Sequence, residues 1–97
     1  MIIEHALVHV RPGEEDAFEI SMVKALAVIE SAPECYGADI RRQIENPSWR
    51  LLTVHWASVE AHLAFRQSSL FERWRELTHR YYDVAPDVTH YGEPLVR

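Results

Sequence analysis

The chain has 97 residues, of which 47 % are hydrophobic and 26 % charged, with a formal net charge of −5. These values are typical of one small globular domain, and the acidic balance argues against general nucleic-acid binding, which needs Lys and Arg to displace counterions. No apolar run reaches the roughly 20 residues of a membrane span, and no signal-peptide pattern is visible. The single cysteine, Cys35, excludes an internal disulfide and is typical of a reducing compartment, so we expect a cytoplasmic protein.

The first half of the chain predicts a strand followed by a helix. Apolar side chains alternate over residues 2–10, so one face of this strand carries Ile2, Ala6, Val8 and Val10, and the other carries Ile3, His5, Leu7 and His9. The turn at Pro12-Gly13 ends the strand, and acidic residues 14–16 favour the first turn of a helix that runs to about Ser31. Its predicted buried stripe is Phe18, Met22, Ala25, Leu26 and Ile29.

A β-hairpin is predicted next, over residues 38–56. The strand Ala38–Glu45 is polar, as expected at a sheet edge, and Asn46-Pro47-Ser48 forms the turn before the apolar strand that ends at Trp56. Cys35 is expected in the preceding loop. An acidic neighbour, Glu34, raises the pKa of a thiol, so Cys35 is a poor candidate nucleophile.

A helical region is predicted from residue 59 to about Tyr82. Ser58 is a suitable N-cap, and a break is expected at Ser68-Ser69, where Ser69-Leu70-Phe71-Glu72 fits a capping box that restarts the helix. One face of this region carries His62, Phe65, Phe71, Trp74, Thr78 and Tyr81. A last strand is expected over Asp87–Gly92.

This order of elements predicts an α+β, ferredoxin-like βαββαβ fold, an antiparallel four-stranded sheet with two helices on one face. The other face carries Leu7, Leu51 and Ile3, and two helices cannot cover it. We therefore expect a homodimer that forms through this sheet face.

The aromatic stripe allows two interpretations. Trp56, Phe65, Phe71 and Trp74 can be core residues alone, or they can surround a pocket in which His62 is the polar group. Histidine ordinarily titrates near 6.5, and an apolar setting keeps it neutral, so His62 is a candidate base, stronger than Glu60 or Glu72. Arg66, with the arginines that follow it, forms either a solvated helix face or a partner for a phenolate.

The six histidines show no metal-ligand spacing. On a strand, His5 and His9 lie about 13 Å apart, and on a helix His62 and His79 lie about 25 Å apart. His5 or His9, His55 and His90 are expected to share one sheet face. We interpret them as half-buried residues near the dimer interface, and we predict no metal.

A family resemblance is carried by four parts of the chain: Trp56-Ala57-Ser58-Val59-Glu60-Ala61-His62 with Phe65-Arg66-Gln67-Ser68, the opening Met1-Ile2-Ile3-Glu4, the turn at residues 11–13, and Pro33-Glu34-Cys35-Tyr36-Gly37. Together they resemble the antibiotic biosynthesis monooxygenase family. The resemblance covers nearly the whole chain, which is expected to be one such domain over residues 1–97. It implies a dimeric α+β barrel that oxidises phenolic or quinol-type aromatics with O2 and without cofactor. Trp56 matches the family's pocket tryptophan, and His62 a polar pocket position. Leu52 departs from the amide found in polyketide-oxidising members, which argues against an anthrone substrate.

A haem-degrading branch has the same fold, but its characteristic residues fall here on Ala6, Phe65 and Arg75, and none is kept. His62 or His79 as a haem ligand in another geometry stays open. We expect a cofactor-independent monooxygenase with His62 and Trp56 as catalytic residues and Phe65, Phe71 and Trp74 as substrate-binding residues. The alternatives are a non-catalytic or stress-related binding dimer, or a barrel that catalyses an isomerisation or cyclisation.

Overall fold

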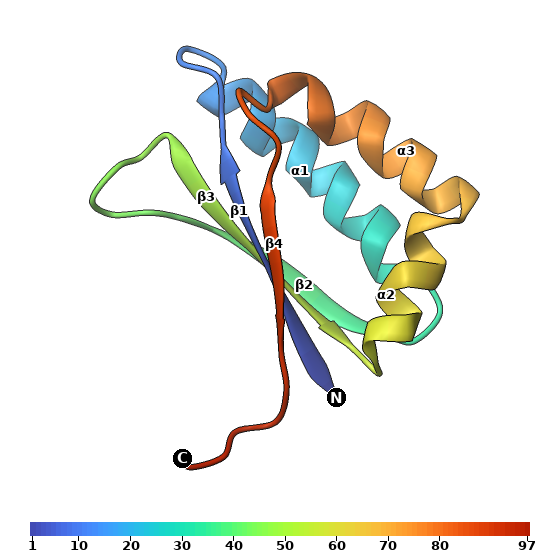
Figure 1. The fold of residues 1–97 in the computed structure, drawn as a ribbon. Helices are drawn as coiled ribbons and strands as arrows, with labels where there is room; N and C mark the ends of the chain where they lie inside the picture. The colour runs from blue at the N-terminus through green and yellow to red at the C-terminus, as the bar shows by residue number, and fades with distance from the viewer.

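The computed structural model describes residues 1–97 and has eight elements in chain order (Figure 1). They are β1 (Ile2–His9), α1 (Glu15–Glu30), β2 (Cys35–Arg42), β3 (Trp49–Trp56), α2 (Val59–Arg66), α3 (Ser69–Thr78), the 3₁₀ turn η1 (His79–Tyr81) and β4 (Asp87–Tyr91). The four strands form one antiparallel sheet in the order β2-β3-β1-β4. The predicted ferredoxin-like α+β class is confirmed, with β2 at an edge as its polar sequence indicated. None of the helices is long and apolar enough to cross a membrane.

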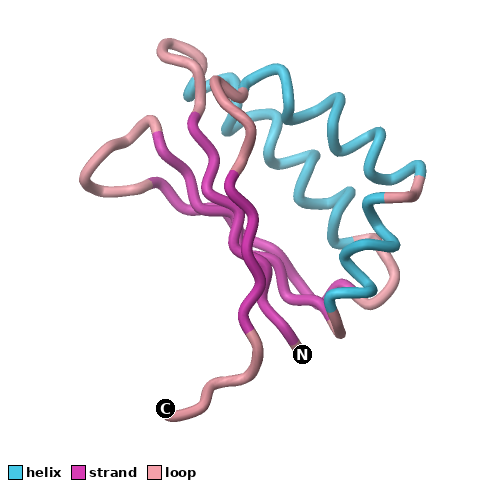
Figure 2. Tube along the Cα trace, viewed as in Figure 1, coloured by secondary structure: helices cyan, strands magenta, loops and turns pink.

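The molecule has two layers, because all three helices lie on the same face of the sheet (Figures 1 and 2). In β1, side chains alternate between the two faces: Ala6 and Val8 are buried under the helices, whereas Leu7 is only partly covered. Leu7 pairs with Leu51 of β3, so both lie on the face without helices, as predicted. This second face is called the open face below.

The core lies between the sheet and the helices. It consists of 16 buried residues, and the predicted stripe of α1 supplies Phe18, Met22, Ala25 and Ile29, with Leu26 packed at its edge. Trp56, Phe65 and Trp74 belong to the same cluster. The aromatic stripe is therefore part of the core, and it also borders a cavity, which is described below.

The helical break between α2 and α3 is confirmed, but the way in which it forms differs from the prediction. Ser58 caps α2 as expected, with its Oγ 3.2 Å from the backbone N of Ala61. The predicted capping box that starts at Ser69 does not form. Ser68 occupies the N-cap position of α3, and its hydroxyl donates to the carbonyl of Phe65 (2.6 Å). This hydroxyl closes the end of α2 and makes no bond to the start of α3.

Two predictions around β2 and β4 are corrected. β2 starts at Cys35, which pairs with Trp56, so Cys35 lies in a strand that contains an irregularity before Gly37. Burial is the main cause that raises the pKa of the Cys35 thiol, with smaller contributions from Glu30 and Glu4 and none from Glu34. In β4, His90 pairs with Glu4 of β1. Paired residues share a face, so His90 lies on the helix side and not beside His5 and His55.

Candidate active site

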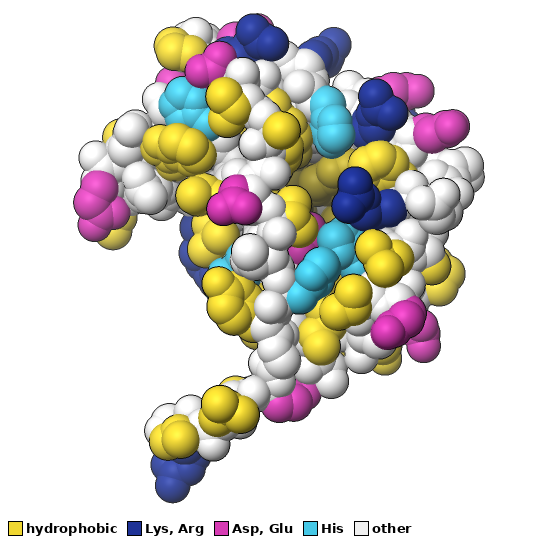
Figure 3. Space-filling model, viewed as in Figure 1, with side chains coloured by type: hydrophobic (Ala, Val, Ile, Leu, Met, Phe, Trp, Pro, Cys, Tyr) yellow, Lys and Arg dark blue, Asp and Glu magenta, His cyan; other side chains and the backbone are white.

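A cavity of about 400 Å³ lies between the helix side of the sheet and helices α2 and α3. Four of the five site residues predicted from sequence line it, namely His62, Phe65, Phe71 and Trp74. Segment 82–88 supplies the wall on the β4 side through Tyr82, Ala85, Pro86 and Val88. Figure 3 shows this hollow with a hydrophobic floor, bordered by histidines and by a Lys or Arg side chain. An apolar, partly aromatic cavity with few polar groups is typical of sites for small organic molecules.

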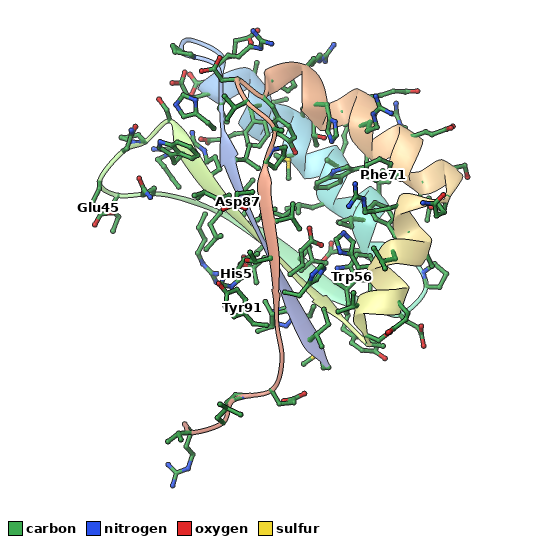
Figure 4. The ribbon with its side chains drawn as sticks, viewed as in Figure 1. His5, Glu45, Trp56, Phe71, Asp87 and Tyr91 are labelled. Carbon is green, nitrogen blue, oxygen red and sulfur yellow. The ribbon has the colours of Figure 1, made fainter.

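Trp56, the fifth predicted residue, is fully buried and does not line the cavity. Its indole stacks on the imidazole of His62, with ring centroids 5.3 Å apart and planes 21° apart, and it also contacts Phe65. Its Nε1–H donates a 2.9 Å hydrogen bond to Oε1 of Glu4. Figure 4 shows Trp56 and Phe71 on the helix side of the sheet, from β3 and α3. Trp56 therefore holds Glu4 and His62 in position without facing the cavity itself.

Glu4 is the buried acidic residue of the cavity, and the sequence analysis missed it. Only 4 % of its surface is exposed, and its Oε1 lies 3.3 Å from Nε2 of His62. Burial raises the pKa of Glu4, while the hydrogen bond from Trp56 and the charge of Arg66 act in the opposite direction. Its Oε2 has no hydrogen-bond partner in the chain, so this oxygen is available to a ligand.

His62 links the cavity to the edge strand β4. It lies in the first turn of α2, is 4 % exposed, and its Nδ1 is 2.7 Å from Nε2 of His90. Burial, followed by the positive charges of His90 and Arg66, lowers the pKa of His62 to about 4. The imidazole is therefore neutral near pH 7, as expected for an apolar setting, and both of its nitrogens already face a partner.

The cationic side chain of the cavity is Arg66, at the end of α2. Its Cζ lies 5.9 Å from the centroid of the Phe71 ring, and it makes no ion pair with any acidic side chain. The ring of His79 also contacts that of Phe71, edge to face with centroids 6.0 Å apart. Burial lowers the pKa of His79, and the charges of Arg75 and Arg66 contribute. Near pH 7, Arg66 is thus the permanent positive charge of this cavity. Its charge lowers the pKa of both Glu4 and His62.

The histidines of the open face have separate partners. His5 packs on Tyr91 (4.8 Å between centroids), and His9 packs on Trp49 (4.6 Å) and contacts Asp83 through Nδ1 (3.1 Å). No three His, Cys, Asp or Glu side chains of the chain converge in the manner of a metal site. The only direct contact between two histidines joins His62 to His90, on the helix side.

Comparison with known proteins gives a consistent result for sequence and structure. The family model of antibiotic biosynthesis monooxygenase matches residues 1–77, which include all the predicted site residues. The uncharacterized protein YczJ of Bacillus subtilis is 32 % identical over 94 residues, which are 96 % of this chain and 99 % of that protein. A Bordetella bronchiseptica crystal structure, named provisionally as an antibiotic biosynthesis monooxygenase, superposes with a TM-score of 0.92 at 36 % identity, covering 97 % of each chain. A Nitrosomonas europaea protein named in the same way has the same fold (TM-score 0.81) at 15 % identity, covering 96 % of this chain and 98 % of its own.

Proposed function

Because this chain belongs to the antibiotic biosynthesis monooxygenase family, we propose that it oxidises a small phenolic or quinol-type aromatic with O2 and without a cofactor. The proposal takes residues 1–97 as one domain of this family. The observation that carries it is the polar end of the cavity, where a buried carboxylate and a neutral histidine lie together beneath aromatic walls. Such an end suits a hydroxyl group on an otherwise flat, apolar ligand.

The substrate ring packs between Phe65, Phe71 and Trp74, with its hydroxyl directed to the free Oε2 of Glu4. Aromatic faces and edges at these positions favour a flat ring over an aliphatic chain of equal size. Leu52 lines the same cavity, where polyketide-oxidising relatives are expected to carry an amide. This apolar substitution favours a smaller substrate with fewer oxygen atoms than a polyketide anthrone.

The Glu4–His62 pair accepts the phenolic proton. Glu4 receives it first, because both nitrogens of His62 already face Glu4 and His90. The raised pKa of Glu4 brings its basicity closer to that of a phenol, which makes it a better acceptor than an exposed carboxylate. Trp56 holds Glu4 in position through its indole N–H, and His62 is the second acceptor.

The phenolate then reduces O2 directly. The ring carbon gains one oxygen atom and loses its hydrogen, the phenolic oxygen becomes a carbonyl, and the second oxygen atom leaves as water with the two hydrogens. This stoichiometry needs no external reductant. Arg66 stabilises the anionic state, since its charge has no acidic partner in the chain.

An oxygen-electrode screen of quinols and hydroxynaphthalenes tests the proposal, together with an absorption spectrum of the purified protein to detect haem or flavin. We expect oxygen consumption with at least one of them. The variants H62A and E4Q should each lower turnover by roughly 10²–10⁴-fold, the usual contribution of a general base, with the fold retained. If the aromatics bind but none consumes oxygen, the chain is a non-catalytic binding member of the family.

We propose further that the chain forms a homodimer through the open face. Ile3, Leu7 and Leu51 lie there only partly buried, and Tyr91 is exposed beside them. A partially covered apolar surface of this kind is stabilised by a second copy, as in a dimeric α+β barrel. Light scattering coupled to gel filtration measures this, and a monomer at micromolar concentration would contradict it.

A further inference from the structure

A continuous line of proton-exchanging groups leads from the cavity to the surface of the molecule. Glu4 on β1 lies 3.3 Å from Nε2 of His62 on α2, and the other nitrogen of His62 lies 2.7 Å from Nε2 of His90 on β4. The first two residues are 4 % exposed, whereas His90 belongs to an edge strand whose residues are all exposed. His90 is not among the residues that line the cavity. The line therefore has one end facing the ligand and the other facing solvent.

We infer that Glu4, His62 and His90 form a proton relay between the cavity and solvent, with His90 as its outer end. The inference rests on the function proposed above and adds a path for the proton and a role for His90. It assigns His90 as a positioning and proton-transfer residue, since this side chain does not contact the substrate.

The relay works by a change of tautomer at His62. The relay assigns the proton of neutral His62 to Nδ1, which lies 2.7 Å from Nε2 of His90, so that the lone pair of Nε2 faces Oε1 of Glu4 at 3.3 Å. When Glu4 has received the phenolic proton on Oε2, rotation of its carboxyl group turns that proton towards His62. Nε2 of His62 then takes the proton, and Nδ1 gives its own proton to Nε2 of His90. His90 then releases the proton on its Nδ1 to water. One proton enters and one leaves, and His62 does not need to remain an imidazolium.

This path removes an objection to a buried histidine base. The surroundings of His62 disfavour its charged form: Arg66 on α2 and His90 on β4 add positive charge, and burial removes water. A base that had to store the proton there would be weak. A base that passes the proton on in the same step avoids that cost, and the indole of Trp56 holds its ring in one orientation.

The stoichiometry also requires a return of the proton. The oxidation produces one water and no net proton, so the proton exported at the start is needed again when the bond between the oxygen atoms breaks. The same groups carry it back in the reverse direction, and this step restores the starting tautomers of both histidines. The relay is therefore used twice in each turnover.

The test uses H90Q, with H5Q as the matched control on the neighbouring strand but on the open face. The probe is 4-nitrophenol, whose absorbance reports its ionisation when it binds, and an indicator dye in weakly buffered solution reports the proton that reaches solvent. We expect H90Q to bind the probe as the wild type does but to release the proton roughly 10²-fold more slowly, at the lower end of general acid–base effects. Added imidazole should restore the rate, and H5Q should match the wild type.

Unchanged proton release in H90Q, or a slow release that imidazole does not restore, would overturn the relay. Oxygen consumption is a separate measurement: a wild type that ionises the probe but oxidises no quinol retains the relay and loses the proposed reaction. If the wild type does not bind the probe, ¹⁵N NMR of the histidine rings decides. The relay requires His62 to exchange between two tautomers, and a single fixed tautomer would refute it.

Discussion

The two faces of the sheet use the same kinds of residue in opposite ways. On the helix side, one histidine, one tryptophan and one glutamate are buried and contact one another. On the open face, His5 and His9 are half-buried and each packs on a single aromatic ring, as Figure 4 shows for His5 and Tyr91. Burial, followed by the positive charges of His90 and Arg66, lowers the pKa of His62, whose Nε2 lies 3.3 Å from Glu4. Residue type alone therefore does not distinguish these histidines, whereas the sheet face and the neighbours of each one do.

The largest difference between the faces should appear when a tryptophan is removed from each. Trp56 and Trp49 are the two ends of β3, and only Trp56 is fully buried. We expect W56A to lower the free energy of unfolding by about 3–5 kcal/mol, because it leaves a cavity and removes the hydrogen-bond donor of buried Glu4. W49A should lower the free energy of unfolding by clearly less, because Trp49 is only partly buried. Urea denaturation followed by circular dichroism measures both, and equal losses would contradict the contrast between the faces.

A charge on the open face should disrupt association more than folding. Leu51 pairs with Leu7 across the sheet on this face. In L51D, a carboxylate without a partner would be buried in the proposed dimer, so we expect the dissociation constant to rise by about 10²-fold or more. Light scattering should then show a folded monomer. If L51D unfolds instead and no soluble monomer appears, the side chain is essential to the core and not to an interface.

Acid should destabilise the protein through His62. The pKa of this residue is lowered from 6.5 to about 4 in the folded state, so the unfolded chain binds more protons between these values. The stabilisation that the neutral form of His62 contributes is therefore fully present above about pH 6.5 and is lost as the pH falls through 4, by about 3 kcal/mol in total. Glu4, whose pKa is raised, acts in the opposite direction. We expect H62Q to flatten the dependence of the unfolding free energy on pH, which urea denaturation at a series of pH values measures; an unchanged dependence in H62Q would contradict the prediction.

The smallest effect should come from the cation at the cavity. Arg66 is exposed, so water screens its charge, and we expect R66Q to weaken binding of a phenolate by only about 3–10-fold. Neutral aromatics of the same size should bind equally to both proteins. The matched control is R73Q on α3, because Arg73 pairs with Glu76 and does not line the cavity. Titration of 4-nitrophenol above and below its own pKa measures the difference, and an equal loss for both forms of the probe would exclude a charge effect.

Much of this fold was predictable because its elements follow simple periodicities. Alternation over residues 2–10 predicted the two faces of β1, and the spacing of Trp74 and Thr78 predicted the buried side of α3. Glu4 was missed although it lies on the same face of β1 as Ala6 and Val8. A charged residue at an inward position of a strand is the signal that would have identified it.

The side of His90 was not predictable in the same way. β4 is short and exposed at all five positions, so its own sequence contains no alternation that fixes its faces. Its register with β1 follows from the connection after α3, which also brings Ala85 and Pro86 to the cavity wall. Long-range pairing of this kind is determined by tertiary packing, and local pattern carries little information about it.

The cavity has a fixed part and an adjustable part. Glu4 and Trp56, which hold the polar end, come from the two central strands and are held by neighbours on both sides. Phe71, His79 and Val88, which shape the rest, come from a surface helix, a single 3₁₀ turn and an edge strand. Substitutions in the second group change volume and polarity without touching the hydrogen bond in the first. A few wall mutations can therefore change which small molecules fit the cavity, both in a lineage that carries this chain and in a library that randomises those three positions.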